Sequence, residues 1–175
     1  MITKEMVRHI KDTLNGLTRG KNTNFRKNEN ATSAPEKGIL VVLTSSDFLG
    51  ENFTSVDQIL ASSTVIGTEE DVFKNDGTNK TIEVINIPYS ETISVVDSGE
   101  ATRFAIVQVD QNDLVSKEIT GSDLDAKLWG KYIINTDSGA NISNYKVLFS
   151  GELTSNQTIQ KDNSFSLSNI KITFN

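Results

Sequence analysis

The sequence contains no cysteine, and it has one histidine and one tryptophan among 175 residues. The absence of cysteine excludes disulfides and thiolate metal sites, so packing alone must stabilise the fold. The single histidine, His9, has polar neighbours on a predicted helix, which favours an exposed helical residue. A catalytic triad or a histidine metal site needs further partners, and the sequence names none. We therefore expect no cofactor.

Long apolar runs are also missing. No run of about eighteen apolar residues occurs, and no basic segment is followed by an apolar one. We therefore expect a soluble protein made in the cytosol, without a membrane span or a secretory signal. Gly16 and Gly20 are four residues apart, but Asn22 follows Lys21 where a P-loop requires Ser or Thr. The sequence therefore predicts no phosphate loop.

Charge is divided unevenly along the chain, which has a net charge of −6. Residues 1–37 hold 8 Lys/Arg and 4 Asp/Glu, a net +4, whereas the remaining 9 Lys/Arg and 19 Asp/Glu give −10. A solvated helix and loop would explain the basic segment. Alternatively, this segment binds an acidic partner surface, the body of a neighbouring copy or nucleic acid. We expect no direct sequence-specific binding of nucleic acid.

An amphipathic helix is predicted within residues 1–20. Thr3 can cap its start, and Asn15, Gly16 and Gly20 supply stop signals. Its apolar stripe consists of Met6, Val7, Ile10, Leu14 and Leu17. Because an isolated helix of this length is marginal in water, we expect it to pack on the β body or on another subunit.

An extended arm is predicted over residues 21–37. This segment is polar, contains Phe25 as its large apolar residue and ends near Pro35. It cannot bury enough apolar surface to fold by itself. Residues 38–175 then form the predicted body.

The body is predicted to be built around a strand over residues 99–110. Its two largely apolar faces hold Ala101, Arg103, Ala105, Val107 and Val109 on one side and Thr102, Phe104, Ile106 and Gln108 on the other. This pattern is typical of a central strand covered on both sides. Because Gln111–Asp113 has turn chemistry and a second run follows over residues 114–119, we expect a β-hairpin.

Other strand signals recur at short intervals. A short helix is predicted over residues 55–61, capped by Ser55 or Thr54. The further predicted strands are Gly38–Thr44, Thr81–Ile87, Thr92–Val96, Lys131–Asn135, Ser143–Ser150, Gln157–Gln160 and Ser164–Phe174. Many short strands separated by turns indicate an all-β protein, an antiparallel β-sandwich or jelly roll.

Two groups of residues suggest ligands, but each also has a structural explanation. The acidic clusters 69–71, 110–113 and 123–125 could share a calcium ion, although none has EF-hand spacing, and turn formation explains 110–113. Trp129, Tyr132 and Tyr145 could form a sugar-stacking platform. Aromatic residues of this kind more often anchor cores or interfaces, which we favour.

One stretch resembles a known family. Ser98–Val107, a turn and then Leu114–Gly121 are similar to a strand and hairpin of small β-sandwich structural proteins of tailed bacteriophages. The order of parts is similar as well: a helix, an arm ending near Pro35, an apolar strand, an insert, the hairpin and a closing strand. Two departures from the family pattern are an Arg before Phe104, where the family more often has it after the aromatic residue, and a longer segment over residues 50–80.

This resemblance implies a non-enzymatic virion protein without catalytic residues, made in the bacterial host cytoplasm. We expect a head accessory or decoration protein, with a neck-ring or head–tail connector protein as the alternative. The expected partners are the major capsid, portal or neck proteins, together with further copies of the chain in an oligomer or symmetric array. The expected assembly contacts are Met6, Val7, Ile10, Leu14, Leu17, Phe25 and Arg26.

Three other functions stay open from the sequence. A carbohydrate-binding module would use the region of Trp129 and Tyr132. A glycosidase or other hydrolase would depend on acidic residues that meet only in space. A fibre or pilin subunit would pair an edge strand with the next chain.

Overall fold

The computed structural model describes residues 1–18, 37–63, 73–75, 77–84, 94–116, 132–161 and 170–174. The elements are α1 (Lys4–Thr18), β1 (Lys37–Thr44), η1 (Val56–Gln58), β2 (Ile59–Ser62), β3 (Phe73–Lys74), β4 (Thr81–Val84), β5 (Ser94–Val95), β6 (Gly99–Asp110), η2 (Gln111–Asp113), β7 (Leu114–Ser116), β8 (Tyr132–Ile134), η3 (Ile142–Asn144), β9 (Lys146–Ile159) and β10 (Ile170–Thr173). Within these ranges, no helix has the length and apolar character needed to cross a membrane.

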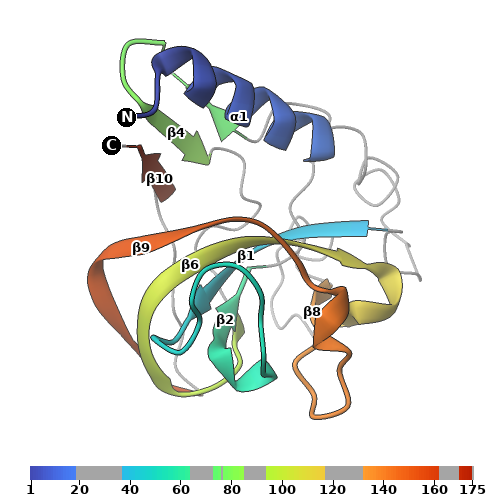
Figure 1. The fold of residues 1–175 in the computed structure, drawn as a ribbon. Coiled ribbons are helices and arrows are strands. Elements are labelled where there is room, and N and C mark those ends of the chain that lie inside the picture. The colour runs from blue at the N-terminus through green and yellow to red at the C-terminus, as the bar shows by residue number, and fades with distance from the viewer. Residues whose placement is uncertain are drawn as a thin grey trace, which may run out of the picture.

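The largest sheet has five antiparallel strands in the order β5-β2-β1-β6-β9 (Figure 1). Strands β1 and β6 pair from Lys37 opposite Asp110 to Thr44 opposite Arg103. A three-stranded sheet, β10-β4-β3, and a two-stranded sheet, β7-β8, complete the described strands. All pairings are antiparallel, so the expectation of an all-β protein with one N-terminal helix agrees with the structure.

Strand β1 is buried on both faces, which explains its continuous apolar sequence. Ile39, Val41 and Leu43 belong to one core cluster, whereas Leu40 and Val42 belong to another on the opposite face. Successive strand residues point to opposite faces, so a strand between two cores must be apolar at every position. The prediction of a buried strand here is confirmed.

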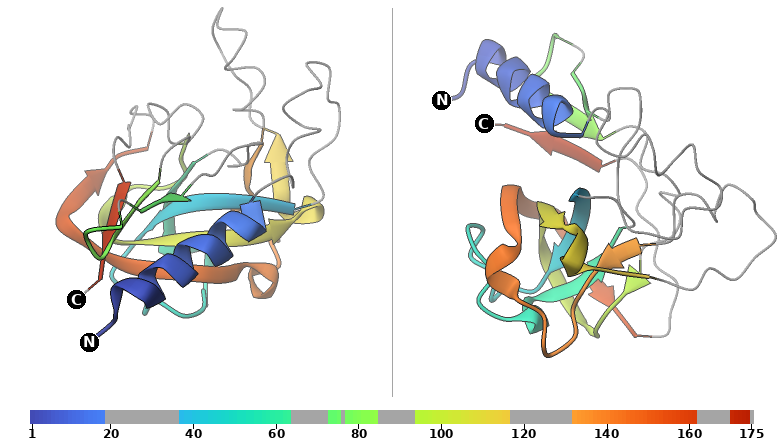
Figure 2. Two further views of the ribbon diagram at one scale, coloured as in Figure 1. Left: turned by 90° about the horizontal axis from the view of Figure 1, so that it is seen from above. Right: turned by 90° about the vertical axis from the view of Figure 1, so that its right-hand side faces the viewer.

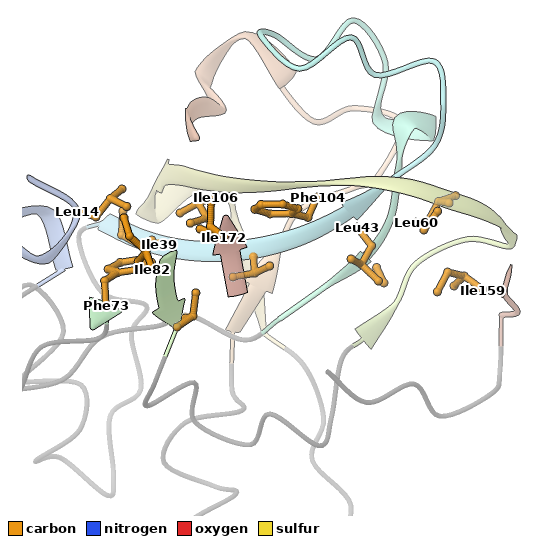
Figure 3. Close-up of a cluster of buried hydrophobic side chains, with 14 of the residues drawn as sticks. Leu14, Ile39, Leu43, Leu60, Phe73, Ile82, Phe104, Ile106, Ile159 and Ile172 are labelled. Carbon is orange, nitrogen blue, oxygen red and sulfur yellow. The ribbon is translucent and has the colours of Figure 1, made fainter. Parts of the chain in front are cut away.

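The first core lies between the large sheet, the small three-stranded sheet and α1 (Figure 2). Ile39 of β1 and Phe104 of β6 pack there with Phe73 of β3, Ile82 of β4 and Ile172 of β10. Figure 3 shows these side chains, together with Leu14 of α1, on one side of the large sheet. The helix therefore covers a core of its own chain.

The second core lies on the other face of the large sheet. Phe48 and Phe53 stack with ring centroids 4.5 Å apart, and the loop that carries them precedes η1. Ser55 caps η1 through a capping box with Gln58, as the sequence predicted for the cap. The expected helix is shorter than predicted, because the chain enters β2 at Ile59.

The predicted hairpin over residues 99–119 is wrong. Strand β6 pairs with β1 and β9, whereas β7 pairs with β8 in a separate sheet. The connecting residues form the 3₁₀ turn η2 and not one of the two-residue turns that return a strand beside its neighbour. The turn thus directs β7 away from the edge of β6.

Strand β9 replaces two predicted strands, Ser143–Ser150 and Gln157–Gln160, because pairing with β6 continues through the polar residues between them. The register shifts twice, once between Ile106 and Val107 and once between Ala101 and Arg103. The second shift also corrects the predicted faces of β6, since Ala101 joins the same core cluster as Phe104 and not that of Val107.

A close contact fixes the middle of this strand pair. Phe104 lies opposite Gly151, and a Cβ placed on that glycine would lie 2.8 Å from Cε1 of the phenylalanine ring. Gly151 therefore provides the space that the buried ring occupies against the backbone of β9.

Candidate functional site

The residues predicted as assembly contacts are divided between the interior and the surface. Val7 and Leu14 are buried in the first core, Ile10 packs against it and Leu17 is half-buried. Met6, in contrast, is 51% exposed. Phe25 and Arg26 lie outside the described residues.

The outer face of α1 carries charges that are largely paired within the helix. Glu5 accepts a hydrogen bond from Arg8 at 2.6 Å and lies 3.6 Å from Nε2 of His9. Thr3 caps the helix by accepting a hydrogen bond from the Met6 amide at 3.2 Å, as predicted. The exposed face thus combines neutralised charges with the apolar side chain of Met6.

Asn15 fixes α1 to the small sheet, a role that the sequence did not reveal. Its side-chain amide donates to the Phe73 carbonyl at 2.8 Å and accepts from the Phe73 amide at 2.9 Å. The buried side chain therefore satisfies the edge of β3 as a neighbouring strand would. The predicted stop at Asn15 and Gly16 is wrong, because this asparagine binds Phe73 and the helix continues to Thr18.

A polar recess lies where β9 departs from regular pairing with β6. Between Arg103, opposite Glu152, and Ala101, opposite Gln157, strand β9 contains three more residues than β6. The recess has a volume of about 270 Å³ and is lined by Ser46, Thr102, Arg103, Glu152, Leu153 and Asn156. Bulges are common next to binding sites because they redirect side chains.

Mixed hydrogen-bonding groups line this recess. Arg103 donates to Glu152 at 2.8 Å, and Asn156 donates to Glu100 at 3.0 Å. Thr102 Oγ1 is buried and has no hydrogen-bond partner in the described part of the chain. The alternating pattern of the strand puts Arg103 on a largely apolar face without indicating a role for it, and a bulge has no reliable sequence signal.

The loop bordering the recess is held in place by two side chains. Ser150 of β9 donates to the Gly50 carbonyl at 2.6 Å, and Gln58 donates to the Asp47 carbonyl at 2.8 Å. Gly50 has a φ of 98°, in the region that favours glycine. Next to it, Leu49 is 83% exposed. The recess therefore has an anchored wall with an exposed apolar residue at its tip.

The acidic turn at 110–113 does not gather metal ligands in the described structure. The described residues contain no group of three or more histidine, aspartate or glutamate side chains placed to hold a metal ion. Asp113 is buried, and its Oδ2 has no hydrogen-bond partner among the described residues. The clusters 69–71 and 123–125 lie outside those residues.

The tyrosines proposed for sugar stacking are buried. Tyr132 and Tyr145 belong to the second core, and Tyr145 donates its hydroxyl to the carbonyl of Asn135. Trp129 lies outside the described residues. Tyr132 and Tyr145 are core residues in this structure, which is the interpretation that the sequence favoured.

Ionisation of the Tyr145 phenol is expected to make the free energy of unfolding depend on pH in the alkaline range. Burial, and then the charges of Asp113 and Asp137, raise the pKa of its phenol from 10 to about 12. The unfolded state therefore loses this proton first, so the free energy of unfolding falls from pH about 10 towards pH about 12. Urea unfolding across this range should show a shallower fall for Tyr145→Phe than for the wild type. Equal slopes would contradict this assignment.

Comparison with known proteins gives no family. A scan against protein-family models, a search of curated proteins and a search of solved structures each found no match to this chain.

Proposed function

We propose that this protein is a non-enzymatic structural component of a tailed-bacteriophage virion that binds other virion proteins through its N-terminal helix and arm. Within the particle, we place it on the head as an accessory or decoration protein. Its partners are the major capsid protein and further copies of itself in a symmetric array. The alternative position is the neck, next to portal or connector proteins.

We also propose that the fold is a β-sandwich. The five-stranded and three-stranded sheets bury one core between them, with Ile106 and Leu43 on one side and Ile82 and Ile172 on the other. A sandwich is the fold implied by the resemblance over Ser98–Val107. The agreement between the two supports the family proposal.

The observation that carries the functional proposal is the anchored helix α1. One face is fixed through Leu14 and Asn15, so the exposed part of the helix, which includes Met6 at the edge of the apolar stripe, is presented in a constant orientation. Met1 and Met6 are large apolar side chains exposed on this part of the chain. Exposed apolar residues on a rigid element suit a contact repeated by symmetry.

The edge of the large sheet formed by β9 is less suited than the helix to contact with another chain, which would have to add a strand there. No described strand pairs with the outer side of β9, but two register shifts interrupt this strand. Bulges and a lysine such as Lys146 protect an edge against pairing with another chain. We therefore place the proposed contact on the helix and not on β9, and we prefer a virion surface protein to a strand-paired fibre.

The first test is quantitative mass spectrometry of gradient-purified particles from the source of the sequence. A copy number near that of the major shell protein is expected for a decoration protein. The number present in a single ring would place the chain at the neck or tail. Absence from the particle would overturn the virion proposal.

A substitution on α1 tests the proposed contact separately. Met6→Glu is expected to reduce incorporation into particles without changing the unfolding curve, because the side chain is exposed. Thr154→Glu places the same new charge on an exposed position of β9 and serves as the matched control. Normal incorporation of the Met6 variant would exclude this face as the assembly contact.

A further inference from the structure

We propose that the loop around Leu49 receives the basic segment 19–27 of a second copy of this chain. The inference rests on the proposed function, in which copies assemble through the N-terminal helix and arm, and it names the surface that the arm binds. This surface, the Leu49 loop, comprises residues 45–57 and runs from the end of β1 into η1. Leu49 itself is 83% exposed at its tip.

The Leu49 loop is held in one conformation by its own side chains. Gln58 donates to the Asp47 carbonyl at 2.8 Å and accepts from the Thr54 amide at 2.8 Å. Phe48 and Phe53, on either side of the tip, stack on each other in the second core. The exposed leucine therefore belongs to a preformed surface, and a partner that covers it does not have to order the loop first.

The charge around this leucine is negative. Residues 38–73 contain six Asp or Glu and no Lys or Arg. Asp47 and Glu51 flank the tip, are exposed, and take part in none of the ion pairs within the described ranges. Arg103 lies close to the loop but pairs with Glu152 at 2.8 Å. The loop therefore favours a partner that is basic and has an apolar side chain.

The segment 19–27 of the arm has this chemistry. It contains four Lys or Arg and no Asp or Glu, and Phe25 is its large apolar residue. Opposite charges would bring the segment to the loop, and contact between Phe25 and Leu49 would remove apolar surface from water. Charge complementarity within the sequence thus makes the arm the occupant that fits this loop.

The connectivity favours an arm from a second copy. The arm joins β1 at Lys37, whereas the Leu49 loop follows Thr44 at the other end of this strand. Helix α1 packs in the first core, whereas the loop packs through Phe48 in the second core, on the opposite face of the sheet. An arm bound to its own loop would have to pass around the sheet, follow β1 to its far end and return. A second copy avoids this path, and a repeated arm-to-loop contact builds a ring or array.

Thiol cross-linking of full-length chains tests the contact, because the natural sequence contains no cysteine. Phe25→Cys and Leu49→Cys proteins are prepared separately, mixed and oxidised with copper phenanthroline. We expect a mixed disulfide dimer in clear excess over the dimer that Phe25→Cys forms with Thr154→Cys, a matched exposed position on β9. In a chain carrying both Phe25→Cys and Leu49→Cys, dimers and larger species should form and should increase with protein concentration.

Sedimentation equilibrium of the purified chain tests the role of charge. We expect the wild type to self-associate, and Glu51→Lys to weaken the association constant about tenfold by placing like charges together. Adding Arg26→Glu to the Glu51→Lys chain should recover most of this loss. Asp137→Lys makes the same charge change at an exposed position of another loop and should leave association unchanged.

Four results would overturn the inference. They are a wild-type chain that stays monomeric at its highest soluble concentration, no excess of the mixed disulfide over the control, an intramolecular disulfide as the main product of the double variant, and equal effects of Glu51→Lys and Asp137→Lys. Leu49 and Glu51 are exposed, so these variants are expected to fold, which their unfolding curves verify. Particle composition is measured independently. A monomeric chain that is still present in particles would overturn this contact and leave the virion proposal standing.

Discussion

Replacing Asn15 with leucine is expected to lower the free energy of unfolding by about 2–5 kcal/mol. The substitution leaves the buried amide and carbonyl of Phe73 without the partners now at 2.9 and 2.8 Å. Each unsatisfied buried group costs about 1–3 kcal/mol, whereas leucine itself favours the helix. Urea denaturation of the wild type and the variant measures the difference.

Two further variants separate the hydrogen bonds from other effects at Asn15. Thr13→Leu changes an exposed position on the same helix and should alter stability by about 0.5 kcal/mol or less. Asn15→Asp keeps the acceptor but turns a carboxylate towards the Phe73 carbonyl, so its pKa should rise in the folded state. Its stability should therefore improve as pH falls and protonation restores a donor. A destabilisation that does not change with pH would argue against this contact.

Leu14→Ala is expected to destabilise the protein by about 2–5 kcal/mol, the range for deleting a buried leucine side chain. Leu14 is 4% exposed and packs in the core that contains Ile39 and Phe73. Met6→Ala removes a similar volume from an exposed position of the same helix and should have little effect. Thermal and urea unfolding of the two variants provide the comparison. Equal stability of both would mean that α1 does not pack on the body.

The packing of α1 on the body decides what deletion of the N-terminal region is expected to do. A separable helix and arm over residues 1–37 would leave a folded body after deletion of the helix. Because Val7 and Leu14 contribute to the first core, we now expect deletion of residues 1–18 to expose Ile39 and Phe73 and to destabilise the body. Surface substitutions such as Met6→Glu are therefore a better test of assembly than truncation.

Local patterns in the sequence were sufficient for several elements. The apolar spacing and Thr3 predicted α1 and its start, and the continuous apolar run predicted β1 as a buried strand. Ser55 or Thr54 was predicted to cap a short helix, and Ser55 caps the 3₁₀ turn before β2. These features depend on side-chain periodicity and on bonds between residues a few positions apart, which the sequence displays directly.

Partners distant in sequence were decided only by the tertiary structure. The geometry of the turn before β7 decides which strand β7 pairs with. Register shifts between β6 and β9 decide where β9 continues and which face of β6 holds Ala101. Neither feature has a fixed sequence pattern. The local sequence indicated a helix stop at Asn15. It could not reveal the hydrogen bonds of this side chain, because their partner, Phe73, is 58 residues away.

The recess depends on the same kind of information. Its lining includes Ser46, Arg103 and Glu152, which come from separate segments and lie near the bulge in β9. Residues so far apart in the sequence form no recognisable motif. The sequence by itself therefore determined the β-rich class, the N-terminal helix and the buried central strands, because these follow from local periodicity. Only the tertiary structure decided which strands pair, where the helix docks and where a polar recess opens, because these depend on long-range packing.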